Sequence, residues 1–207
     1  AYELGNRGPI EFDANGMLRE DITEAYWRTG FYVFEGVVGG EELDELVVEF
    51  ERLLARAPTS STASTDAAGR VAIGAEFEQP SFRFAKPLSD PYGGTWRYEG
   101  KMTELEAPVD APEEIVLQIV GILQLMDACL RLYGNPQLLS VVEQINGPDF
   151  APFNETIWVK HPGLGASTAW HQDGTTHWNN PELDRGTHGF NFMAQLYPTN
   201  PTNALWV

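Results

Sequence analysis

Apolar side chains recur at helical spacing in several stretches of the first 149 residues. The clearest is residues 41–57, where leucine, valine and phenylalanine follow the i, i+3, i+4, i+7 rule. Residues 21–28 predict a shorter helix, with Asp21 as its N-cap and Glu24 as the capping-box partner. Residues 136–145 predict another, because they follow an Asn-Pro pair that favours a helix start.

A longer helix is predicted from Asp110 to Tyr133. Asp110 suits the N-cap, Pro112 the first turn and Gly134 the C-terminal stop. Cys129 falls within the apolar stripe of this helix and is expected to be inert packing. The stripe comprises Ile115, Ile119, Ile122, Leu123, Met126 and Leu130.

Strand-like runs dominate after residue 150, where helical periodicity disappears. Residues 157–159 and 190–197 are rich in β-prone and aromatic side chains, and residues 204–207 read as a further buried strand. One early strand is expected at residues 31–34. Because an apolar strand is a poor place for a domain to end, we expect the parent protein to continue beyond Val207.

Two segments predict irregular structure. Residues 59–69 are a low-complexity run of serine, threonine and alanine that we expect to be flexible and exposed. Residues 71–105 interleave aromatic side chains with arginines and lysines. This second segment has two readings, either an irregular edge of the core or a lid that binds substrate.

Composition narrows the possible functions. The chain has 207 residues, 43% of them hydrophobic, which suits a single domain with a sizeable core. A net charge of −17 makes binding to nucleic acid by electrostatics improbable. The single cysteine excludes an intrachain disulfide, and neither a membrane-length apolar run nor a signal-peptide pattern is present. We therefore expect a soluble, cytoplasmic protein without a membrane partner.

His171 and Asp173 are the strongest candidates for chemistry. On a strand, side chains two residues apart project from the same face, so an imidazole and a carboxylate can reach one metal ion. With a further histidine they would form the 2-His-1-carboxylate triad of non-haem Fe(II) oxygenases. The alternative is that Asp173, which precedes Gly174, forms an Asx turn that closes a strand.

Three blocks of sequence, in order, resemble the phytanoyl-CoA dioxygenase family of Fe(II)/2-oxoglutarate-dependent oxygenases. They are RTGFYVFEGVVGGEELDELVVEFERLL near the start, ETIWVKHPGLGASTAWHQDGTTHW in the centre and FNFMAQLYPTNPTNALWV at the end. The resemblance implies a mixed α/β (α+β) domain spanning residues 1–207. Residues 1–149 would be a helical part with a variable segment at 59–110, and residues 150–207 the first half of a double-stranded β-helix (jelly-roll, cupin-like) core, incomplete at its C-terminal end.

The resemblance also implies the site. His171 and Asp173 would bind Fe(II), and 2-oxoglutarate would be the cosubstrate. Contacts with 2-oxoglutarate are expected from the strand before the His-x-Asp motif and from the later strand, at Thr156, Trp158, Lys160, Phe192 and Gln195. The family's third iron ligand and its 2-oxoglutarate-binding arginine would lie beyond Val207, which would leave this chain alone inactive. His161, His177 and His188 are poorly placed as substitutes.

The implied activity is hydroxylation of an unactivated C–H bond in a small organic substrate, with O₂ consumed and succinate and CO₂ released. The enzyme would be a monomer or a homodimer. Two alternatives remain open. A zinc-dependent hydrolase would use His171, Asp173 and His177 to activate water, and a non-catalytic jelly-roll protein would bind a ligand through its aromatic segment.

Overall fold

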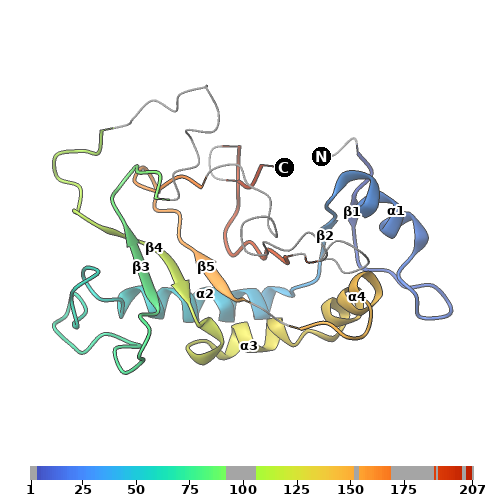
Figure 1. Ribbon diagram of the computed structural model, residues 1–207, viewed down its shortest axis with the longest axis horizontal. Helices are drawn as coiled ribbons and strands as arrows, with labels where there is room; N and C mark the ends of the chain where they lie inside the picture. Colours follow the sequence, from blue (N-terminus) through green and yellow to red (C-terminus); the bar gives the residue numbers. More distant parts are fainter. Residues whose placement is uncertain are drawn as a thin grey trace.

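In a computed structural model, residues 4–91, 106–151, 154–168, 189, 191–201 and 204–206 are described, and they form a mixed α/β fold (Figure 1). Among the helices in these ranges, none has both the length and the apolar character that crossing a membrane requires. The elements in chain order are β1 (Arg7–Gly8), α1 (Glu20–Thr29), β2 (Val33–Phe34), α2 (Gly40–Ala55), β3 (Phe82–Ala85), β4 (Ile115–Val120), the 3-10 helix η2 (Ile122–Gln124), α3 (Asp127–Tyr133), α4 (Pro136–Asn146) and β5 (Thr156–Trp158).

The predicted helix at residues 41–57 is confirmed as α2, which begins and ends within two residues of the expected bounds. Its apolar stripe is buried at Leu46, Phe50 and Leu53. The acidic side chains of the first turn complement the positive end of the helix dipole. This amphipathic stripe makes α2 the main helix of the core.

The predicted helix from Asp110 to Tyr133 is wrong. The chain there forms strand β4, the 3-10 turn η2 and the short helix α3. Gly121 breaks the run, since its φ of 69° lies in the left-handed region that glycine tolerates. A β-bulge also interrupts β4: the register with β3 shifts beside Leu117, so Val116 and Ile119, three residues apart, both face the core.

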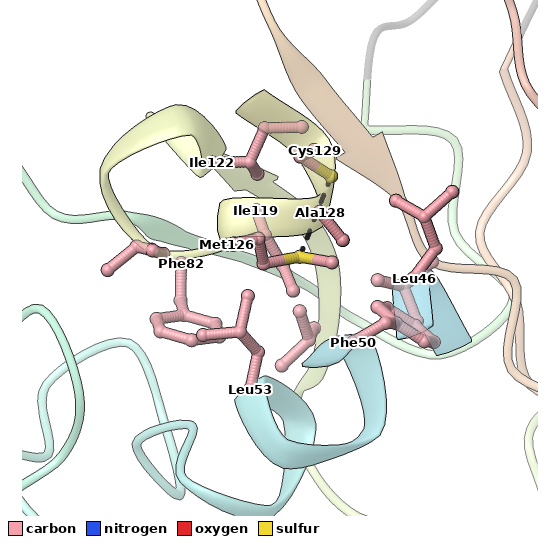
Figure 2. Packing of buried hydrophobic residues seen from close by; sticks show 12 residues of the cluster. Leu46, Phe50, Leu53, Phe82, Ile119, Ile122, Met126, Ala128 and Cys129 are labelled. Atoms are coloured by element: carbon pink, nitrogen blue, oxygen red, sulfur yellow. Dashed lines mark hydrogen bonds between the residues drawn. The ribbon is translucent and has the colours of Figure 1, made fainter. Parts of the chain in front are cut away.

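Strands β3, β4 and β5 form an antiparallel sheet with β4 in the centre. Helices α2 and α3 run along one side of it (Figure 1). We call the side toward these helices the core face; it carries Phe82, Phe84, Val116, Ile119, Ile157 and Val159. Leu46, Phe50, Leu53 and Met126 pack against it (Figure 2).

Cys129 lies within this core, as expected, although on a shorter helix. Its side chain is buried, and its thiol contacts the Met126 sulfur at 3.8 Å (Figure 2). Burial, together with the nearby Glu49 carboxylate, raises the pKa of the thiol from 9.0 to about 11. The cysteine is therefore a protonated packing group at neutral pH.

A second, smaller cluster joins the N-terminal segment to α4. Leu18, Ile22 and Val141 are its buried members. The Gln144 side chain accepts a hydrogen bond from Leu18 N and donates one to Gly16 O at 3.1 Å. Segments more than 120 residues apart in sequence are thus held together.

The N-terminal ends of α1 and α4 test the two capping predictions. Asn135 caps α4 as expected, with its Oδ1 accepting hydrogen bonds from Gln137 N at 2.9 Å and Leu138 N at 3.2 Å. Asp21 does not cap α1, which begins one residue earlier. Asp21 instead lies in the first turn of the helix, and its carboxylate pairs with the guanidinium of Arg19, the N-cap residue, at 2.7 Å.

The prediction that residues 59–69 are flexible and exposed is wrong for part of the segment. The Asp66 side chain is buried and pairs with Arg56 at 2.9 Å and Arg70 at 2.8 Å. Burial alone would raise the pKa of Asp66, but hydrogen bonds from Arg70 and Ala68 lower it below its usual value. This carboxylate ties the loop to the end of α2.

The C-terminal strands are also not observed in the residues that the structure describes. Residues 191–197 have no regular strand, and Leu205 and Trp206 are exposed rather than buried. The segment is held instead by side chains. Leu196 packs against the main core, and the Tyr197 ring meets the Phe50 ring edge-on at 6.0 Å between centroids.

Candidate functional site

The proposed metal ligands His171 and Asp173 lie outside the described residues, as do His177 and His188. The structure does describe the strand and loop that lead to them, up to Thr168. It also describes all five residues expected to contact 2-oxoglutarate: Thr156, Trp158, Lys160, Phe192 and Gln195.

Strand β5 divides its side chains between the two faces of the sheet. Ile157 and Val159 belong to the core face, so Thr156, Trp158 and Lys160 lie on the opposite face by the two-residue period of a strand. The structure therefore places three of the expected contact residues on one face. We call this side the polar face and define it by Arg83, Gln118, Thr156, Trp158 and Lys160.

Three members of the polar face form a row across the sheet. Arg83 on β3 is the register partner of Gln118 on β4, and Gln118 is the partner of Trp158 on β5. Arg83 Nη1 donates a long hydrogen bond to Gln118 Oε1 at 3.5 Å. Gln118 is buried, although it is polar, whereas Arg83 is exposed and Trp158 is 36% exposed.

Sequence reasoning did not identify Arg83 and Gln118 as site residues. Gln118 was placed inside a helix, and Arg83 was one of several cations in an irregular segment. The alternation Phe82-Arg83-Phe84, apolar at both ends and charged between, was the signal that predicts a strand with one polar side.

The polar side chains of β5 and of Lys160 just after it use part of their hydrogen-bonding capacity within the protein. Thr156 Oγ1 donates to Ile119 O at 3.2 Å, which uses the hydroxyl proton and leaves the oxygen able to accept. Lys160 Nζ donates to Ala166 O at 2.7 Å. Partial burial lowers the pKa of Lys160 from its usual value, but an ammonium group has three donors, so two remain for other partners.

The loop that leads toward His171 is fixed by backbone hydrogen bonds. Ser167 N donates to Ser89 O at 2.9 Å, and Leu88 N donates to Leu164 O at 3.0 Å. Gly163 supplies the left-handed turn of this loop with a φ of 72°. These bonds join the loop after β3 to the loop after β5, and so fix the position of the chain at Ser167, four residues before His171.

His161 lies on the other side of the sheet from this row. Its Nε2 is 3.1 Å from Val116 O. It also lines a shallow, mostly apolar hollow of about 340 Å³ with Leu54, Phe84 and Leu164. This position keeps the imidazole away from the polar face.

Phe192 and Gln195 are exposed, and the residues around them form no strand in the described part of the chain. The contacts described for their segment run to α2, where Leu196 packs on the core and Tyr197 Oη donates to Glu51 Oε1 at 3.3 Å. Their expected role therefore lacks the strand on which it was based.

Metal-ligating side chains do not cluster within the ranges that the structure describes: no group of three or more His, Cys, Asp or Glu there could hold an ion. The chain matches no protein-family model, no curated protein and no solved structure. Its function must be argued from its own residues.

Proposed function

We propose that this chain belongs to an Fe(II)- and 2-oxoglutarate-dependent dioxygenase that hydroxylates a small organic substrate. The observation that carries the proposal is the division of β5. One face of the strand is sealed by α2 and α3, and the other presents Thr156, Trp158 and Lys160 just before the His171-x-Asp173 motif. In a double-stranded β-helix with helices packed outside, that second face would be the interior of the barrel.

The donor set fits the metal by its chemistry. A neutral imidazole nitrogen from His171 and an anionic carboxylate oxygen from Asp173 are the protein ligands of non-haem Fe(II) sites that leave open positions. When bound there, iron and 2-oxoglutarate would supply the activation of O₂, with succinate and CO₂ as co-products.

The described residues would bind and orient 2-oxoglutarate. The Lys160 ammonium is a cation on the polar face with donors to spare, which suits a carboxylate of 2-oxoglutarate. Thr156 Oγ1 can accept a hydrogen bond beside it. The core behind the sheet, with Ile119 fully buried, keeps the strand rigid and shields one side from water.

The test is succinate formation by the full-length natural protein supplied with Fe(II), ascorbate and 2-oxoglutarate. We expect Asp173→Ala to lower turnover by at least about 100-fold, because loss of the carboxylate removes one of the protein ligands. Asp149→Ala, at an exposed carboxylate, is the matched control and should leave turnover unchanged.

Metal analysis separates the alternatives. Iron bound with a stoichiometry near one, and lost in Asp173→Ala, supports the oxygenase. Tight zinc with no succinate from any preparation would favour the hydrolase that uses His171, Asp173 and His177. A protein that binds neither metal would leave a binding role for the jelly-roll alternative.

A further inference from the structure

We propose that the row Arg83–Gln118–Trp158 binds an organic acid with an aromatic or apolar body, with the carboxylate on Arg83, which Gln118 orients, and the body against Trp158. Its identification as the substrate to be hydroxylated rests on the proposed function. The binding site itself is argued from the described residues alone.

The first argument is the charge around Arg83. In this strongly acidic chain, most of the arginines whose contacts are described are neutralised by carboxylates. Within the ranges that the structure describes, Arg83 forms no ion pair, and its only hydrogen bond is the long one to Gln118. The arginines paired with carboxylates are Arg7, Arg19, Arg56, Arg70 and Arg131.

A guanidinium in this state suits a ligand carboxylate. Its five donors form a planar fork that matches two carboxylate oxygens, and one weak bond to an amide leaves most of the fork unused. Gln118 is 5% exposed, so it is a fixed acceptor that orients the guanidinium rather than a mobile surface group.

The second argument is the surface beside the arginine. Trp158 is two strands from Arg83, so their Cα atoms are roughly 10 Å apart at the usual strand spacing. Its indole is partly exposed and offers an aromatic surface on the same face. A ligand that reaches both groups needs an anion at one end and an apolar body about two strands long.

The proposed reaction also requires a site for 2-oxoglutarate, and Lys160 supplies a cation for its carboxylate. It lies on the same face as Trp158, two residues along the chain, and it has no ion-pair partner in the described part of the chain. Lys160 would thus serve 2-oxoglutarate and Arg83 the substrate, with Trp158 contacting the body of the substrate rather than the cosubstrate.

The test is calorimetric titration of the full-length natural protein with 3-phenylpropanoate, its uncharged amide and 2-oxoglutarate, each without iron. We expect 3-phenylpropanoate to bind and the amide to bind at least about 10-fold more weakly. Arg83→Gln should weaken binding of the acid on the order of 10- to 100-fold, as loss of a charged hydrogen-bond partner does. Trp158→Leu should weaken acid and amide alike by about 3- to 10-fold.

Arg131→Gln is the matched control, because this exposed arginine lies on α3 and should leave binding unchanged. Should Arg83→Gln fail to fold, the side-chain Nε–H resonance of Arg83 in the wild-type protein provides an independent readout, and it should shift on addition of the acid. Equal binding of acid and amide, wild-type affinity in Arg83→Gln, or no binding at millimolar acid would overturn the proposal.

The titration with 2-oxoglutarate shows whether the carboxylate on Arg83 comes from the substrate or from the cosubstrate. If 2-oxoglutarate binds through Arg83 more tightly than 3-phenylpropanoate, the assignment of the row to the substrate is wrong. Because these titrations contain no iron, their result does not depend on whether succinate is formed.

Discussion

The two faces of the β3–β4–β5 sheet differ in almost every property, although the same three strands make both. The core face is apolar, and Ile119 at its centre is completely buried. The polar face has an arginine, a buried glutamine and a partly exposed tryptophan in one row. The strands thus anchor the helices with one set of side chains and carry polar side chains on the other face.

The β-bulge at Leu117 makes this separation possible. Without a bulge, Val116 and Ile119 would face opposite sides, because residues three apart on a regular strand do so. The extra residue lets both join the core, and Gln118 turns to the polar face. Leu117 itself packs in a small cluster with Ala85 and Ala166. An irregularity in β4 therefore keeps the two faces chemically distinct.

The largest expected effect on stability contrasts the two faces directly. Ile119→Ala should lower the free energy of unfolding by about 2–5 kcal/mol, because it opens a cavity in a fully buried site. Trp158→Ala, on the polar face, should cost about 1 kcal/mol or less. Urea unfolding measures both. Equal losses would mean that the polar face is as much a part of the core as the other.

A smaller effect is expected from Gln118→Leu, which makes the polar row apolar. The substitution removes the acceptor of the Arg83 hydrogen bond, so we expect a loss of about 0.5–1.5 kcal/mol in the same assay. Gln124→Leu is the control, since Gln124 is exposed on η2 and should change little. A more stable Gln118→Leu protein would show that the polar row is not held by this bond.

The C-terminal segment tests how the edge of the core is closed. Tyr197→Phe removes the 3.3 Å hydrogen bond to Glu51 but keeps the ring on Phe50, so the loss should be below about 0.5 kcal/mol. Tyr197→Ala removes the ring as well and should cost about 1 kcal/mol more. If the two variants unfold alike, the ring contact contributes nothing to stability.

Chemical labelling of Cys129 measures how well the core face protects a buried thiol. Because burial raises its thiol pKa to about 11, the thiolate that reacts with disulfide reagents is scarce at pH 8. We expect labelling by Ellman's reagent to be at least about 100-fold slower in the folded protein than in 6 M guanidinium.

The same pKa shift also has a signed effect on pH stability. The unfolded thiol ionises near pH 9.0 and the folded one near 11, so this group's contribution to stability is full below pH 9 and falls as the pH rises toward 11. Thermal unfolding of wild type and Cys129→Ala at pH 8 and pH 10.5 measures it. A wild-type protein that loses no more stability than the variant would contradict the shift.

The fold was predictable where local signals and tertiary packing agree. Helix α2 has an amphipathic stripe and a charged first turn, and the cap of α4 is a single asparagine; both were found in the sequence. Strand β4 was missed because Ile115 and Ile119 are four residues apart, a spacing that suits one face of a helix as well as one face of a strand. The buried Asp66 was missed because its partners, Arg56 and Arg70, meet it only in the folded loop.

Part of the candidate site was likewise predictable from the sequence, and part was not. Placing Thr156, Trp158 and Lys160 on one face needed only the two-residue period of a strand. Finding Arg83 and Gln118 beside them needed the pairing of strands more than 30 residues apart, which a single sequence does not encode locally. The metal-binding roles of His171 and Asp173 remain predictions from their spacing and from the family resemblance.

The hydrogen bonds between Gln144 and the N-terminal segment have a consequence for folding during synthesis on the ribosome. Leu18 and Gln144 are 126 residues apart. At about 5–20 residues per second, roughly 6–25 s pass between the synthesis of the two. For that interval α1 is without Val141, its buried partner. Helix α1 is thus packed well after it is made, and its apolar side is open to chaperones until α4 emerges.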